Sequence, residues 1–271
     1  MITIADVARF LDEFAPPRLA AEWDNVGLLI GARSAPITRL MTCLTITPAS
    51  AAEALRERAE LIVTHHPFPF RPLKRITSDT ITGELLLKLI AGGVGVHSPH
   101  TAFDSAARGI NQQLAQKLAL RDITPLIPER NVAAMDTPLG SGRVGLLPTP
   151  LKLDRFAAAA AAALKLPGAK VAGHSSQQQM VERVAIGCGS AGEFLAAAHQ
   201  AGCQAFVTGE ATFHTCLEAE ALGVGLILLG HYASERFAVE TLADVLAAEF
   251  PQLKVWPSRD EADPLQWVEA G

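Results

Sequence analysis

The sequence predicts an α/β protein built on largely parallel β-sheets. Short apolar runs, about four to eight residues long, alternate with longer amphipathic runs, and this alternation is typical of βαβ units. It occurs in two blocks, separated by a proline-rich middle. The 271 residues correspond to one large or two small domains at about 100–200 residues each. With 49% hydrophobic and 19% charged residues, the chain can bury an extended core.

The first block opens with an amphipathic helix that ends at Pro16-Pro17. Later runs predict strands over 39–46, 61–64 and 94–97 and helices after Thr47-Pro48, over 80–91 and over 109–118. Thr47 and Pro48 suit the cap and the first position of a helix, and Gly92-Gly93 suits a helix end.

The middle of the chain, about residues 124–179, predicts an alanine-rich helix over 156–164 and short strands over 142–147 and 170–172. The second block predicts strands over 184–187, 205–208 and 225–229 and helices over 191–201, 212–222 and 234–250. We therefore predict an N-terminal α/β lobe over residues 1–123, a bridging region over 124–180 that belongs to the second lobe, and a C-terminal α/β segment over 181–271.

Composition excludes several classes of protein. The net charge of −5 argues against a general nucleic-acid binder, which neutralises phosphates with Lys and Arg. No apolar run reaches the roughly 18–20 residues that span a bilayer, and the N-terminus carries acidic residues instead of the basic region of a secretory signal. The four cysteines form no C-x-x-C pair, which fits a reducing cytoplasm.

Polar side chains follow the predicted strands directly. Ligands in open α/β sheets bind beyond the carboxyl ends of the strands, so these residues are candidates for one site. They are His65 and His66 after the strand 61–64, His97, His100 and Asp104 after 94–96, Glu210 and His214 after 205–208, and His231 and Glu235 after 225–229.

Imidazole and carboxylate groups in this arrangement indicate a metal site, suited to zinc, iron, manganese, nickel or cobalt. His65 and His66 are neighbours and can serve different ions, while His231 and Glu235 stand four residues apart. His100 and Asp104 have the same spacing in what we interpret as a turn-rich loop.

Each of these residues has an ordinary interpretation when taken singly. A His-His pair can be hydrogen-bonded turn residues, Glu235 a first-turn acid, Asp104 a turn residue and His214 a surface residue. Taken jointly, the clusters favour metal. We interpret His97 as structural or supporting, and the remaining histidines, His174 and His199, as ordinary residues.

The segment Gly187–Gly192 matches G-x-G-x-x-G after a predicted strand, and Glu210 stands where a dinucleotide-binding fold places its ribose acid. This pattern suggests NAD. The polar residues at the neighbouring strand ends call for a metal instead of a pyrophosphate, so we interpret the glycines as a tight strand–helix turn that can contact substrate.

Six stretches resemble one known family, the Nif-three-like dinuclear-metal proteins, also called GTP cyclohydrolase I type 2 homologues, in the short form without an inserted domain. The stretches are WDNVGLLIG (23–31), LIVTHHPFPF (61–70), HSPHTAFD (97–104), GCGSAG (187–192), FVTGEATFH (206–214) and GHYASE (230–235). In one departure, this chain has Thr45 where many relatives carry an aspartate, which puts in doubt any base assigned to that position.

The resemblance implies two linked α/β lobes with a dinuclear metal site in the cleft between them, at the carboxyl ends of the strands. It implies two divalent ions per subunit, held by His65, His66, Asp104, His231 and Glu235, with Glu235 bridging. His100, Glu210 and His214 would lie beside that cleft, Trp23, Asp24 and Asn25 match the family's N-terminal motif, and the chain would form a homohexameric ring.

Two functions follow as hypotheses. The first is a metal-dependent hydrolase that opens the imidazole ring of a purine nucleotide through a metal-bridging hydroxide, with His100, His214 and Glu210 as catalytic residues. Four cations are available for phosphate, although we interpret each as a solvated surface charge: Arg71, Lys74, Arg130 and Arg143. The alternative is a non-catalytic metal-binding ring with a regulatory or scaffold role.

Overall fold

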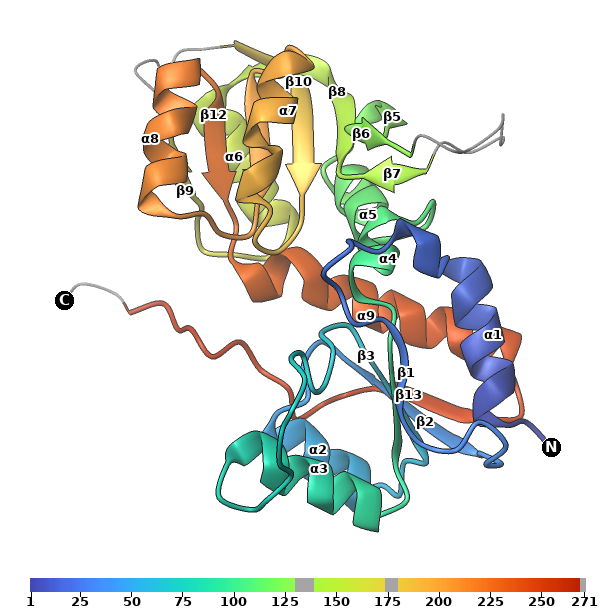
Figure 1. Ribbon diagram of the computed structural model, residues 1–271. Coiled ribbons are helices and arrows are strands. Elements are labelled where there is room, and N and C mark those ends of the chain that lie inside the picture. Colours follow the sequence, from blue (N-terminus) through green and yellow to red (C-terminus); the bar gives the residue numbers. More distant parts are fainter. Residues whose placement is uncertain (130–138, 174–179, 269–271) are drawn as a thin grey trace. The chain divides into compact units, whose positions relative to one another are not determined.

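The computed structural model describes residues 1–129, 139–173 and 180–268. Contacts divide the chain into two compact units (Figure 1). Unit 1 comprises Met1–Phe103 and Arg236–Ala262, and unit 2 comprises Asp104–Glu235 and Asp263–Gly271. Two of the three boundaries inside the chain fall in helices, α4 (His100–Ser105) and α9 (His231–Glu249).

Unit 1 contains a five-stranded sheet with the order β1-β4-β3-β2-β13. The strands are β1 (Gly27–Ile30), β4 (Gly95–Ser98), β3 (Leu61–Thr64), β2 (Arg39–Cys43) and β13 (Lys254–Pro257). Neighbouring strands from β4 to β13 run parallel, and β1 is antiparallel to β4. The carboxyl ends of β2, β3 and β4 therefore lie at one edge of this sheet.

Helices cover both faces of this sheet (Figure 1). On one face, α2 (Pro48–Arg56) and α3 (Ile81–Ala91) pack against alternate strand residues, including Met41, Ile62 and Val96. On the other face lie α9, whose Val239 carbonyl accepts a hydrogen bond from the Thr42 hydroxyl at 3.0 Å, and α1 (Ile4–Phe14), which is followed by the short helix η1 (Pro17–Leu19).

Unit 2 contains a six-stranded sheet with the order β5-β8-β10-β11-β12-β9. Its central strands β10 (Met180–Gly187), β11 (Ala205–Thr208) and β12 (Gly225–Leu228) run parallel. Antiparallel strands flank them: β8 (Arg143–Lys152), β5 (Arg121–Thr124) and β9 (Lys170–Ala172). A separate two-stranded pair joins β6 (Ile127–Pro128) and β7 (Gly140–Ser141).

Helices also cover both faces of the second sheet. The helices η2 (Gly192–Phe194), α7 (Leu195–Gln200) and α8 (Phe213–Leu222) pack on one face through a core that includes Phe206 and Leu226. The helices α5 (Ile110–Lys117) and α6 (Leu153–Ala163) contact β8 and β10. The fold is therefore α/β with sheets that are parallel at their centres and antiparallel at some edges, as predicted.

The units do not coincide with the predicted boundaries at residues 123 and 180. The segment that holds α5 and β5 was assigned to the first lobe, but β5 pairs with β8 and belongs to unit 2. Most of α9, together with β13, was assigned to the C-terminal segment. These elements belong to unit 1 because β13 forms a parallel pair with β2.

The local predictions differ from the structure mainly at short elements. The strands at 61–64, 170–172 and 205–208 have the predicted bounds. The predicted loop that holds His100 is the helix α4, and the helix predicted to start at Ser234 already begins at His231. The side chains of Thr47 and Thr212 cap α2 and α8, each by accepting a hydrogen bond from a backbone N–H three residues on.

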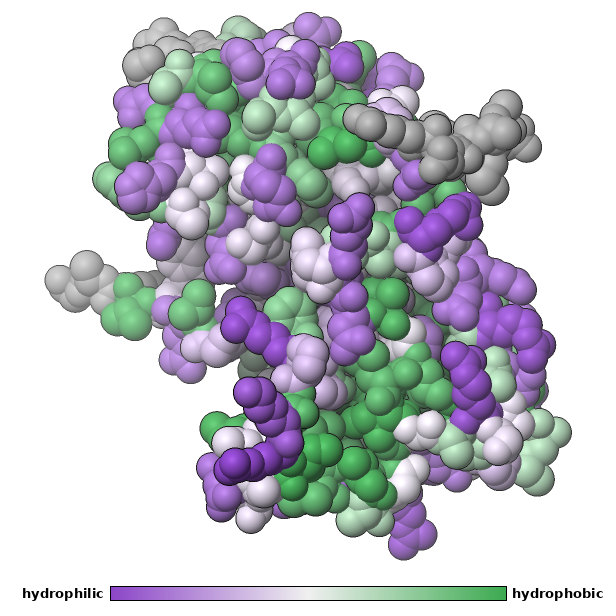
Figure 2. Space-filling model, viewed as in Figure 1, coloured by the Kyte–Doolittle hydropathy of each residue, from purple (hydrophilic) through white to green (hydrophobic). Residues whose placement is uncertain are grey.

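Among the described residues, no helix is long and apolar enough to cross a lipid bilayer. Figure 2 shows hydrophobic residues gathered over α3, and the exposed ones on this helix are Ile81, Leu87 and Ile90.

Candidate metal centre

Three histidines of unit 1 form a compact cluster. His65 and His66 follow β3 directly, and His100 begins α4 just after the parallel neighbour β4. The ring centroid of His65 lies 5.0 Å from that of His66 and 5.1 Å from that of His100, and the centroids of His66 and His100 lie 5.6 Å apart. One ring nitrogen from each residue lies within 4.8 Å of the other two. The structure therefore brings these three residues together at the carboxyl ends of β3 and β4.

Backbone hydrogen bonds continue the sheet past the end of β3 and hold the two adjacent histidines. The His65 N–H donates to the Cys43 carbonyl at 3.0 Å, and the His66 N–H donates to the Leu44 carbonyl at 2.9 Å. The Ser98 hydroxyl donates to the His65 carbonyl at 2.6 Å. His65 is buried and His66 is half-buried, and both follow an ordered backbone.

Asp24 orients His100. Its Oδ1 lies 2.7 Å from His100 Nδ1, and its Oδ2 accepts hydrogen bonds from the backbone N–H and the hydroxyl of Thr101. Burial acts to raise the pKa of Asp24, but the hydrogen bonds from His100 and Thr101 outweigh it and lower this pKa to about 2. The anionic carboxylate therefore favours a proton on Nδ1 and leaves Nε2 of His100 available to a ligand. His100 has a φ of 25°, a region that these contacts must stabilise.

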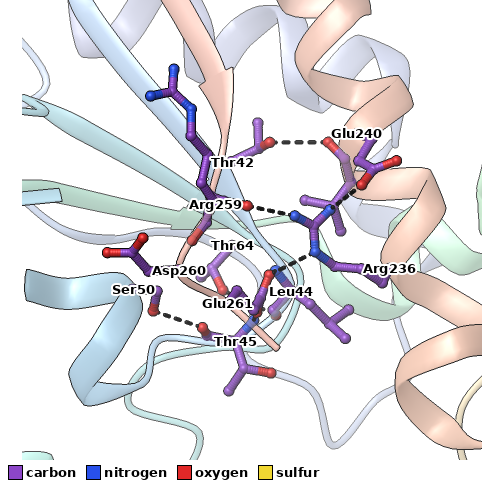
Figure 3. Close-up of polar contacts among 12 residues, drawn as sticks. Thr42, Leu44, Thr45, Ser50, Thr64, Arg236, Glu240, Arg259, Asp260 and Glu261 are labelled. Carbon is purple, nitrogen blue, oxygen red and sulfur yellow. Dashed lines mark hydrogen bonds and ion pairs between the residues drawn. The ribbon is translucent and has the colours of Figure 1, made fainter. Parts of the chain in front are cut away.

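Thr45 performs the corresponding role for His66. Its hydroxyl Oγ1 lies 2.7 Å from His66 Nδ1. The Thr45 N–H donates to Glu261 Oε1 at 2.6 Å, and the Leu44 N–H donates to Glu261 Oε2 at 2.9 Å. Glu261 in turn forms a buried ion pair with Arg236 at 3.0 Å, as Figure 3 shows. At the position noted as a departure from the resembled family, a hydroxyl thus contacts His66, on a loop held by a carboxylate from the C-terminal segment.

In unit 2, His231 is bracketed by two carboxylates. Its Nε2 lies 3.2 Å from Glu235 Oε2, one turn along α9, and its Nδ1 lies 3.0 Å from Glu210 Oε1, which follows β11. The hydrogen bond with Glu235 raises the pKa of His231 to about 9, against the opposing effect of burial and with a further contribution from Glu210. A cation can replace the proton between Nε2 and Oε2, which is the chemistry expected of two neighbouring metal ligands.

Asp104 lies against the glycine-rich turn that follows β10. Its Oδ1 accepts a hydrogen bond from the Cys188 thiol at 3.1 Å, and burial raises the pKa of that thiol. Asn111 completes the contact: its Nδ2 donates to the Asp104 carbonyl at 3.1 Å and its Oδ1 accepts from the Cys188 N–H at 2.7 Å.

Gly189 of the same turn lies directly beside Glu235. A Cβ atom at this position would come 2.1 Å from Glu235 Oε1, and the φ of Gly189 is +61°. Its N–H also donates to the Ser234 hydroxyl at 3.0 Å. The second glycine of the G-x-G-x-x-G pattern is thus explained by a close approach of backbone to a carboxylate, a reason that sequence spacing does not reveal.

Other predicted residues lie in different surroundings. His214 is exposed on the first turn of α8, where its ring packs against Phe213. His97 is buried in β4, where burial lowers its pKa to about 4, and neither ring nitrogen has a hydrogen-bond partner among the described residues. His199 is exposed on α7, and His174 lies outside the described residues.

The interpretation of Arg143 as a surface charge is wrong. The side chain is buried, and its guanidinium donates to the carbonyls of Gly140, Gly142, Ser105 and Ala106 and to the side chain of Gln112. Burial lowers the pKa of Arg143 to about 10. It is therefore a structural residue of unit 2.

The other cations considered for phosphate binding lie in different parts of the chain. Arg71 and Lys74 are exposed, as expected, and Arg130 lies outside the described residues. Sequence reasoning missed two contacts that support the candidate ligands, those of Glu261 and Gly189, and it assigned Thr45 only as a departure. The loop position of Glu261 carries no local signal that could have identified it.

The histidine cluster of unit 1 fits a divalent transition metal, because imidazoles are good ligands and the Nδ1 atoms of His66 and His100 are held by oxygen atoms. His231 and Glu235 make a second pair of candidate ligands within unit 2. The arrangement can bind a Lewis acid next to groups that hold protons.

Comparisons with known proteins agree with this description. The model of the family Duf34/NIF3 (NGG1p interacting factor 3) matches residues 2–264. The chain is 31% identical to NIF3-like protein 1 of Drosophila melanogaster, covering 98% of this chain and 89% of that protein. It is 30% identical to a GTP cyclohydrolase 1 type 2 homolog of Clostridium perfringens over 85% and 86% of the two chains.

A solved structure has the same fold. The structure of the chain superposes on the crystal structure of Staphylococcus aureus protein SA1388 with a TM-score of 0.87 at 26% identity, covering 98% of this chain and 99% of that one. A match over nearly the whole chain, two relatives of at least 30% identity and a shared fold lead to one conclusion. This chain belongs to the Duf34/NIF3 family.

Proposed function

We propose that this protein is a metal-dependent hydrolase that opens the imidazole ring of a purine nucleotide. The observation that carries the proposal is the cluster of His65, His66 and His100, in which two of the three Nδ1 atoms are held by side-chain oxygens. The name that relatives carry, GTP cyclohydrolase 1 type 2 homolog, supports the choice of substrate.

We propose a set of five ligands for two divalent ions: His65, His66, Asp104, His231 and Glu235. The set rests on the sequence resemblance, and the contacts within each unit support it. When bound, two such ions supply Lewis acidity and lower the pKa of a water molecule. His231 carries a proton between carboxylates in the metal-free protein, and loss of that proton frees Nε2 to act as a ligand.

The supporting residues have separable roles in this proposal. Asp24 holds the Nδ1 proton of His100 and so directs its Nε2 toward the other histidines. Glu210 holds Nδ1 of His231 from the end of β11, and Nε2 of His231 faces Glu235. His100 is placed to transfer a proton to or from a substrate. His214 is exposed and has no contact with Glu210 or His231 among the described interactions, so its proposed part in proton transfer is the least supported.

Metal analysis together with a turnover assay tests the proposal. The protein would be purified without chelator, its metal content measured by mass spectrometry, and GTP ring opening followed by liquid chromatography with and without chelator. We expect bound divalent metal, ring-opened product, and loss of both in His65→Ala. His199→Ala removes an exposed histidine from α7 and serves as the matched control.

Full metal loading without turnover of any purine nucleotide would contradict the hydrolase and leave the non-catalytic metal-binding ring as the remaining function. Retention of metal by His65→Ala would contradict the proposed ligand set. Either result can be obtained independently of the other.

We also propose that the chain forms a homohexameric ring in the cytoplasm. The ring is carried over from the family resemblance, and the cytoplasm from the four cysteines, none of which forms a disulfide among the described residues. Multi-angle light scattering would test the oligomer, with a monomer or dimer as the contradicting result.

A further inference from the structure

Two exposed aromatic rings lie beside the histidine cluster of unit 1. Trp23 is 64% exposed and Phe70 is 47% exposed. The ring centroid of His100 lies 6.0 Å from that of Trp23 and 6.2 Å from that of Phe70, in both cases edge to face. The two aromatic rings lie 6.0 Å apart at an interplanar angle of 71°. Large apolar side chains that gather at the surface commonly mark a binding site.

The loops that carry these rings are anchored, so their exposure is not the result of loose chain ends. Next to Trp23, Asp24 is buried and holds His100 and Thr101. Asn25 Nδ2 donates to the Pro69 carbonyl at 3.1 Å and so joins the two loops next to both rings. On the other side, Phe68 packs against the core of unit 1. An ordered backbone thus presents Trp23 and Phe70 to the solvent.

We propose that Trp23 and Phe70 form a stacking site that holds the purine ring of a ligand beside the histidine cluster of unit 1. This inference rests on the proposed function and names the residues that would select its substrate. Two rings at a steep angle offer a face and an edge, which suits a planar ring that stacks on one and meets the edge of the other. Base–aromatic stacking tolerates different bases because each has a π-face.

The surroundings of the rings fit a nucleotide. Arg71 and Lys74 follow Phe70 on the same loop and are exposed, so a phosphate on the ligand would meet positive charge. The exposed hydrophobic residues of α3, by contrast, are aliphatic and offer no π-face. Trp23 and Phe70 combine exposed aromatic rings with direct ring contacts to His100.

Binding measurements on the metal-loaded protein test this inference without requiring turnover. Isothermal titration calorimetry would compare guanosine 5′-monophosphate with ribose 5-phosphate, which lacks the ring. We expect Trp23→Leu to weaken binding of the nucleotide roughly tenfold and to leave binding of ribose 5-phosphate unchanged. Trp23→Phe should retain most of the affinity. Trp267→Leu, which removes another exposed indole from the C-terminal segment, should bind both ligands as the wild type does.

Several results would overturn the stacking site. One is equal nucleotide affinity in Trp23→Leu and Trp267→Leu, and a second is that the metal-loaded wild type binds no nucleotide. A third is that iodide fails to quench the fluorescence of Trp23, because a second copy of the chain would then cover the ring. Phe70→Leu provides a second variant if Trp23→Leu loses metal. Trp23-dependent binding without ring opening would remove the hydrolase and keep the stacking site. Ring opening with a KM that is unchanged in Trp23→Leu would keep the hydrolase and remove the stacking site.

Discussion

Replacing Thr45 by valine should weaken metal binding while leaving the fold intact. Valine has the shape of threonine but lacks the hydroxyl that lies 2.7 Å from His66 Nδ1. The backbone contacts of residue 45 with Glu261 do not involve the hydroxyl, so they remain. The substitution therefore isolates one hydrogen bond to one candidate ligand.

The structure sets the size of the effect. The lost contact is a single hydrogen bond of a hydroxyl at a half-buried position, which corresponds to about 0.5–1.5 kcal/mol. Losing a partner that orients a metal-bound histidine reduces metal affinity by about 10–100-fold. The neutral hydroxyl places Thr45 at the lower end, so we expect a loss of about tenfold, or about 1.4 kcal/mol.

Competition with a chromophoric zinc chelator at constant pH measures this affinity directly. Thr45→Ser keeps a hydroxyl and should restore binding close to that of the wild type. Thr241→Val, which removes a hydroxyl from the exposed side of α9, is the matched control and should bind zinc normally. Wild-type affinity in Thr45→Val, or failure of serine to restore affinity, would refute the positioning role.

Three further results are expected. Arg143→Met should lower the free energy of unfolding of unit 2 by at least about 3 kcal/mol, measured in urea titrations. The reason is that buried carbonyls lose their hydrogen-bond donor, at a cost of about 1–3 kcal/mol for each carbonyl. A change below about 1 kcal/mol, as for an ordinary surface mutation, would contradict this. Gly189→Ala should displace Glu235 and reduce metal affinity, whereas Gly202→Ala, at a similar φ of +71° with open space around it, should alter stability alone. In metal-free protein, the raised pKa of His231 contributes stability that is complete below pH 6.5 and is lost as the pH rises through about 9. The melting temperature measured in chelator should therefore fall over this pH range, and Glu235→Gln should make that fall smaller.

The sequence by itself determined the fold class and the elements made of continuous buried residues. The strand Leu61–Thr64 was predicted with its observed bounds because all four residues are apolar or β-branched and buried. Thr47 predicted the start of α2 because the cap is a contact between near neighbours. The strand β13 was missed because four residues that include Lys254 and a proline carry little periodicity, and its place in the sheet depends on pairing with β2, more than two hundred residues away.

The candidate site divides in the same way. His65, His66 and His231 could be identified from the sequence because each follows a strand, and the position of a strand end is a local property. The structure alone decided which groups support them. Glu261 contacts Thr45 across 216 positions of the sequence, and Gly189 approaches Glu235 only once β10 and α9 are packed within unit 2. Such contacts form only when segments that are distant in the sequence pack together. Periodicity and spacing along the chain therefore cannot predict them.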